Sequence, residues 1–147
     1  MTMRAVVIDR PGAPEVLSLK EVKRPSPAAH EVLVKVHASG LNRADLLQRR
    51  GLYPAPPGSP ADITGLEFAG EVAESPSGEW VRGARVMGIV GGGAAAEYLT
   101  VPASHLLPTP EHLSDAEAAA IPEAFMTAYD AAVLQGGLQR GEWLALN

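Results

Sequence analysis

Apolar and polar residues alternate along much of the first forty residues, and this alternation predicts three strands. In the third segment, valines at every second position share one face, while Leu33, Lys35 and His37 share the other. A period of two is typical of half-buried strands in antiparallel sheets. The predicted strands are Met3–Asp9, Val16–Val22 and His30–Ser39.

A short helix is predicted directly after the third strand. Asn42 is a suitable N-cap, Asp45 falls at the third helical position, where a carboxylate favours the positive helix end, and Gly51 ends the helix. The segment Tyr53–Pro60 is too rich in proline and glycine for regular structure, so it is predicted to be a loop.

The alternating pattern resumes after this loop and predicts a second group of strands. Glycines at positions 65, 70, 83 and 88 indicate bends or close backbone approaches, as a curled sheet requires. The fold class predicted for this part is mainly β with short helices, arranged as a small β-barrel. The additional strands are Leu66–Ala73, Ala84–Val90 and Ala95–Val101.

The pattern becomes helical after residue 105. Ser114 and Glu117 have the spacing of a capping box that opens an alanine-rich turn. Residues Glu123–Gln135 are predicted to form a helix that ends at the glycine pair 136–137, and Glu142–Asn147 are predicted to begin a new strand.

Composition narrows the possible functions. The 147 residues suffice for one well-buried core, and the net charge of −5 offers no basic surface for nucleic acid or an anionic membrane. The absence of cysteine excludes disulfides and thiolate zinc sites, and the four scattered histidines lack metal-ligand spacing. With no secretory leader or membrane-length apolar run recognised, a soluble cytoplasmic protein is expected.

Four short segments occur in order along the chain: GLNRADL at 40–46, TGLEFAG at 64–70, GGGAAAEY at 91–98 and AAAIPEAF at 118–125. In this order they resemble the medium-chain dehydrogenase/reductase superfamily, and within it the zinc-independent NADPH quinone oxidoreductases. Together the segments span much of the chain, which makes the resemblance far more specific than a single glycine motif.

The resemblance implies a two-part organisation. Residues 1–122 correspond to a GroES-like β-barrel on the substrate side. Residues 123–147 correspond to a connecting helix and the first strand of a dinucleotide-binding Rossmann domain, which binds pyrophosphate at a glycine-rich turn. That turn is not reached by residue 147, so the chain by itself is expected to be inactive or nearly so. The full-length family members imply a homodimer.

The resemblance also indicates catalysis without a metal. The zinc-dependent members of the superfamily have cysteine, histidine and cysteine ligands at the positions of Asn42, Leu66 and Glu123. An amide, an alkyl group and a carboxylate do not form a stable tetrahedral zinc site. No metal site is therefore expected.

By resemblance, the reaction is NADPH-dependent reduction of a small-molecule quinone by hydride transfer. Asn42 and Thr127 are expected to face the nicotinamide, and Tyr53 to donate to the developing quinone oxyanion. Asp45 is a third catalytic candidate, as a polar group in the cleft or as a first-turn charge. Glu67 is expected to hold the loops of the site. Structural roles for Asn42 as an N-cap, Tyr53 as a packed loop aromatic and Thr127 as a helix residue stay open.

Two other functions are compatible with these motifs. An enoyl reductase of the same superfamily needs a positioned proton donor, which Tyr53 supplies. A non-catalytic GroES-like binding module is the second alternative, although a connecting helix and a starting strand have no evident use in such a module.

Overall fold

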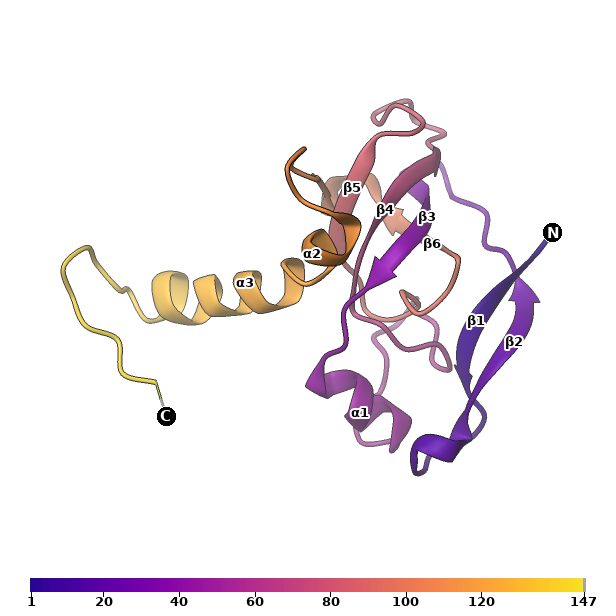
Figure 1. Cartoon of the computed structure of the whole chain (residues 1–147), viewed down its shortest axis with the longest axis horizontal. Coiled ribbons are helices and arrows are strands. Elements are labelled where there is room, and N and C mark those ends of the chain that lie inside the picture. The colour runs from indigo at the N-terminus through magenta and orange to yellow at the C-terminus, as the bar shows by residue number, and fades with distance from the viewer. Residues whose placement is uncertain (147) are drawn as a thin grey trace.

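The computed structural model describes residues 1–146, which form two antiparallel sheets, flanking helices and a projecting C-terminal segment (Figure 1). The first sheet pairs β1 (Thr2–Ile8) with β2 (Leu17–Lys23) after a short 3₁₀ turn at Pro14–Val16. The two strands predicted for this part of the chain are confirmed, with small differences at their ends.

The second sheet has five strands in the order β6-β3-β4-β5-β7, all paired antiparallel. Register shifts in the pairing of β3 with β4 bend the sheet, and isolated bridges from residues 5 and 7 join the first sheet to its curled edge. The mainly β fold class is therefore confirmed, as a curled, half-closed barrel. The strands are β3 (Glu31–Ser39), β4 (Glu67–Glu74), β5 (Arg85–Ile89), β6 (Tyr98–Pro102) and β7 (Leu106–Pro108).

The core lies inside the curl of the larger sheet. Phe68 is fully buried and packs with valines 32, 34, 72, 86 and 101 from four strands. Leu33 is also buried, although it was predicted to share a polar face with Lys35. β6 begins three residues later than predicted, and the three-residue β7 was not predicted because so short a strand has no readable alternation.

Helix α1 (Arg43–Arg49) follows β3 directly, with Asn42 as its N-cap residue. Gly51 has a φ of 75°, and its N–H donates to the Gln48 carbonyl while that of residue 52 donates to the carbonyl of residue 47. This pair of bonds is the Schellman motif that glycine allows. Both predicted ends of the helix are therefore confirmed.

Helix α2 (Asp115–Ala119) begins with the predicted capping box and packs against β3, β4 and β5. Helix α3 (Pro122–Tyr129) continues as a π-helical turn at Asp130–Gln135 and projects away from the sheets (Figure 1). The helix predicted over Glu123–Gln135 is confirmed. Within residues 1–146, no helix combines the length and the apolar character needed to cross a membrane.

The strand predicted to begin at Glu142 is wrong for residues 142–146, which have no regular structure, and Asn147 lies outside the described residues. A strand exists only through hydrogen bonds to a neighbour. Residues 142–146 lie at the end of the projecting segment, away from both sheets (Figure 1). The division of the chain at residue 122 stays a prediction.

Candidate functional site

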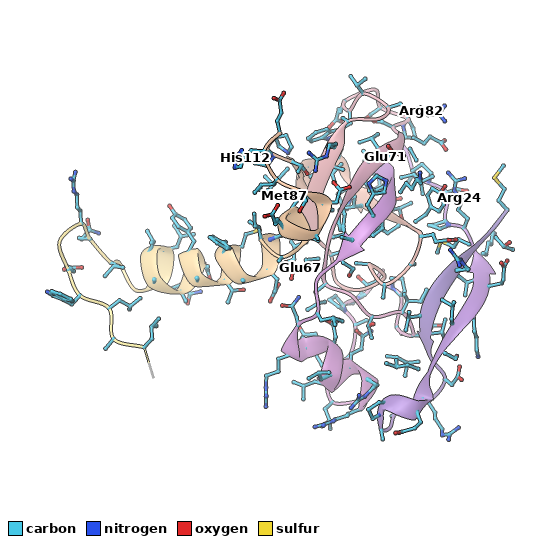
Figure 2. The ribbon with its side chains drawn as sticks, in the orientation of Figure 1. Arg24, Glu67, Glu71, Arg82, Met87 and His112 are labelled. Carbon is cyan, nitrogen blue, oxygen red and sulfur yellow. The ribbon has the colours of Figure 1, made fainter. Side chains whose placement is uncertain are left out.

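Three segments that are distant in sequence meet at the carboxylate of Glu67, the first residue of β4. Glu67 is only 3% exposed. Its Oε1 accepts a hydrogen bond from Asn42 Nδ2 at 2.9 Å, and its Oε2 accepts one from the Glu123 backbone N–H at 2.9 Å. Figure 2 shows Glu67 between the start of α1 and the first turn of α3. The prediction that Glu67 holds the loops of the site agrees with these contacts.

The backbone of residues 39–40, between β3 and α1, lies directly against Glu67. The Gly40 N–H and the Ser39 hydroxyl both donate to the Glu67 carbonyl, at 3.3 and 3.0 Å. A Cβ at position 40 would collide with Glu67 Oε1, so the close approach requires glycine. Gly40 belongs to one of the motifs quoted above, but its contact with Glu67 could not be predicted from the motif.

Asp45 is buried beside this junction, with 5% exposure. Its Oδ2 accepts from the Asn42 backbone N–H and its Oδ1 from the Gly65 N–H, both at 2.8 Å. Backbone donors therefore occupy both oxygens. These contacts favour the first-turn structural role over an open polar group in a cleft, and a catalytic role for Asp45 stays a prediction.

Tyr53 and Thr127 are both solvent-accessible. Tyr53 is 41% exposed in the loop after α1. Thr127 is exposed on α3, where its hydroxyl donates to Glu123 Oε1 at 3.5 Å. Thr127 is thus linked to Asn42 indirectly, through the helix that Glu67 anchors. The predicted roles of Tyr53, Asn42 and Thr127 toward substrate and cofactor stay predictions.

A cavity of about 760 Å³ lies elsewhere, between the first sheet, the loop at 57–60, the turn at 91–93 and β6. Asn42, Tyr53 and Thr127 are not among its lining residues. The glycine turn beside this cavity is closely packed, since a Cβ at Gly91 would collide with Ser59 Oγ. The hydrogen-bonded junction at Glu67 is the better candidate site, because it joins the predicted functional segments.

The three positions that the resemblance aligns with the ligands of zinc-dependent enzymes, 42, 66 and 123, lie at or next to this junction. Asn42 and Glu123 both contact Glu67, and Leu66, which precedes Glu67, is a buried apolar residue. In the part of the chain that the structure describes, no group of three or more histidine, cysteine or acidic side chains is arranged to hold a metal ion.

An ionic cluster that the sequence did not indicate fastens α2 to the sheet. Arg85 Nη2 lies 2.7 Å from Asp115 Oδ1, and His37 Nδ1 lies 2.8 Å from Asp115 Oδ2. Glu71, labelled in Figure 2, pairs with Lys35 at 3.2 Å on the same face. The hydrogen bonds from Arg85 and then His37 hold the pKa of Asp115 below the usual carboxyl value of 3.8. The cluster fixes α2, and α2 leads directly into α3.

Large apolar side chains are exposed on the C-terminal segment and on the connection before α1. Singly exposed apolar residues are ordinary, whereas several on one projecting segment are unusual. The exposed fractions are 67% for Phe125, 57% for Tyr129, 65% for Leu134, 98% for Trp143 and 91% for Leu41.

The comparisons with known proteins agree with the mainly β fold described above. Residues 28–111 match the alcohol dehydrogenase GroES-like domain. The human quinone oxidoreductase is 35% identical to this chain in an alignment 150 positions long. The alignment covers 95% of this chain and 44% of the human protein. A phenolphthiocerol/phthiocerol polyketide synthase of Mycobacterium tuberculosis is 37% identical over 92% of this chain and 6% of its own length.

Solved structures show the same relationship. The human synaptic vesicle membrane protein VAT-1 homolog-like protein superposes with a TM-score of 0.87 and 36% identity, over 96% of this chain and 46% of that chain. The Coxiella burnetii quinone oxidoreductase superposes with a TM-score of 0.83 and 30% identity, over 97% of this chain and 47% of that chain.

The chain therefore belongs to the alcohol dehydrogenase GroES-like domain family of the medium-chain dehydrogenase/reductase superfamily, as its motifs indicated. It spans less than half the length of each of these relatives.

Proposed function

We propose that this chain forms the substrate-side half of an NADPH-dependent quinone reductase that transfers hydride without a metal. The observation that carries the proposal is the junction at Glu67. Where zinc-dependent relatives have metal ligands, Asn42 and the backbone of Glu123 are bound to one buried carboxylate. A quinone needs no Lewis acid to accept hydride, because its ring is already electrophilic.

The residues at this junction fit a nicotinamide. The carboxamide of nicotinamide both donates and accepts hydrogen bonds, and the amide of Asn42 and the hydroxyl of Thr127 offer both functions. NADPH, when bound, would supply the hydride from its C4 atom. Asn42 and Thr127 orient the ring, and the fixed ends of α1 and α3 keep the two groups at a constant separation.

Tyr53 acts on the quinone side of the site. Its phenol, on an exposed loop, donates a hydrogen bond to the quinone oxygen on which negative charge develops. Asp45 keeps the first turn of α1 in place through its two backbone contacts. After hydride transfer the hydroquinone anion needs one proton, which comes from water or from Tyr53, whose phenolate then takes a proton back from water.

The exposed apolar side chains of α3 and of residues 143–146 support a covered surface on this side of the site. We propose that residues 123–147 begin the nucleotide-binding domain and that this domain packs on them. Residues 1–122 then form the substrate-side domain. We further propose that the full-length protein is a cytoplasmic homodimer that binds neither nucleic acid nor a membrane.

The test uses the protein as it is encoded, including any sequence that follows residue 147, with NADPH and 1,4-benzoquinone. Oxidation of NADPH is followed by its absorbance, with and without a zinc chelator. We expect quinone-dependent turnover that the chelator leaves unchanged. Turnover that disappears with the chelator would contradict the metal-free proposal.

A variant pair tests the role of Tyr53. Tyr53→Phe removes the hydroxyl donor and should lower kcat by about 100-fold, the usual effect of losing one oxyanion donor. Tyr98→Phe is the matched control, because Tyr98 lies on β6 with Arg24 stacked 4.0 Å above the centre of its ring. Equal turnover of the two variants would remove Tyr53 from the mechanism.

The enoyl reductase alternative is favoured by one observation, the accessible phenol of Tyr53, which suits a proton donor to a reduced C=C bond. The same assay with an enoyl thioester in place of the quinone separates the two reactions. A protein that neither binds NADPH nor reduces either substrate would instead be a GroES-like binding module.

A further inference from the structure

We infer that Glu67 is a positioning residue for the proposed reduction, because its carboxylate sets the direction of the Asn42 amide and anchors the first turn of α3. The inference rests on the proposed function and extends the predicted role of Glu67, from holding the loops of the site to orienting the Asn42 amide during the reaction. Three features of the junction carry it.

The first feature is the chemistry of the contact with Asn42. Both carboxylate oxygens of Glu67 accept hydrogen bonds, Oε1 from the Asn42 amide and Oε2 from the Glu123 N–H, so the amide nitrogen of Asn42 faces Glu67 and its oxygen points away. A reversed amide would place two oxygens against each other at a carboxylate that is 3% exposed. Glu67 therefore determines which end of the amide is available to a nicotinamide.

The second feature is the start of α3. Its first N–H groups have no partner within the helix, and its N-cap residue Ile121 has no side chain that accepts a hydrogen bond. Glu67, 56 residues away in the sequence, accepts from the Glu123 N–H instead. Its negative charge also suits the positive helix end. The helix that carries Thr127 is thus held by the same carboxylate as Asn42.

The third feature is the space left for the carboxylate. The absence of a side chain at Gly40 lets Oε1 of Glu67 occupy the region where a Cβ would otherwise be. The backbone of the connection between β3 and α1 is therefore built around the position of Glu67.

The experiment uses the protein as encoded and compares Glu67→Gln, Asn42→Ala and the double variant. A glutamine keeps the shape but replaces one acceptor by a donor, so the two donors can no longer both be satisfied. We expect Glu67→Gln to lower kcat about 10-fold with little change in the KM for quinone. In the Asn42→Ala background the same change should cost less than about 3-fold, because its effect passes through Asn42.

The matched control is Glu74→Gln, which removes the exposed carboxylate of the last residue of β4. It should leave turnover unchanged. Additive effects of the two site variants, or normal turnover in Glu67→Gln, would overturn the inference while leaving the proposed function intact. If Glu67→Gln does not fold, Glu67→Asp replaces it, since it keeps the charge but is one methylene too short to reach both donors.

A second measurement tests the anchoring of α3 separately. If the unmodified protein shows no NADPH-dependent quinone turnover, the proposed function fails and the positioning role of Glu67 fails with it, and deuterium uptake then tests only the contact between Glu67 and α3. Loss of the Glu67 contact should speed amide exchange in residues 121–128 relative to the Glu74→Gln control. Unchanged exchange there would overturn the anchoring of α3.

Discussion

Two glycines with similar backbone angles and different surroundings provide a sharp test of the packing around the site. Gly65 has a φ of +100° and Gly83 a φ of +84°, so alanine is strained at both. A Cβ at Gly83 meets nothing within 4 Å. A Cβ at Gly65 would lie 2.5 Å from the Ala95 nitrogen and 2.9 Å from Ala94 atoms.

The magnitudes follow from this difference. Gly83→Ala should cost about 1 kcal/mol, the left-handed penalty less the gain from a stiffer unfolded chain. Gly65→Ala adds overpacking of about 1–3 kcal/mol and strains the 2.8 Å bond from its N–H to Asp45 Oδ1. With about 1 kcal/mol for the strained hydrogen bond, its total cost should be about 3–5 kcal/mol.

The assay is urea-induced unfolding of the two variants and the parent chain under identical conditions, compared by transition midpoint at constant slope. The Gly65→Ala variant should unfold at a clearly lower urea concentration than Gly83→Ala. Losses that agree within about 0.5 kcal/mol would show that the strand backbone at 94–95 does not lie against Gly65 as described.

Three further results are expected. Phe68→Ala removes the largest fully buried side chain and should cost about 3–5 kcal/mol in urea unfolding, and a loss below about 1 kcal/mol would contradict its central position. The hydrogen bond from Arg85 lowers the pKa of Asp115 in the folded protein. This carboxylate therefore stabilises the fold at any pH above its pKa in the unfolded chain, and that stabilisation is lost as the pH falls through its lowered pKa in the folded chain. Asp115→Asn should therefore flatten the stability profile below about pH 4 and destabilise the chain at neutral pH, and an unchanged profile would contradict the pairing. Trp143 is 98% exposed, whereas the indole of Trp80 donates to a backbone carbonyl, so iodide should quench the chain's emission strongly and that of Trp143→Phe weakly. Equal quenching of both proteins would place Trp143 in a protected position.

Local chemistry was sufficient to predict most secondary structure. The alternation in β3, the N-cap at Asn42, the glycine that ends α1 and the capping box at Ser114 depend on neighbours within a few residues. The strand predicted at 142–146 was wrong because a strand depends on a distant partner and not on neighbours within a few residues. Its apolar residues are compatible with a strand, but a strand requires a partner that local sequence cannot supply.

The candidate site shows the same division. The sequence by itself determined which residue types stand at positions 42, 67 and 123, and with them the absence of thiolate or imidazole at the positions of the metal ligands. Only the tertiary structure decided that Glu67 satisfies two donors that lie 25 and 56 residues away, and that Asp115 joins β3 and β5 through His37 and Arg85. The reason is physical, because hydrogen bonds and ion pairs act over about 3 Å in space and the fold, not the order of residues, sets those distances.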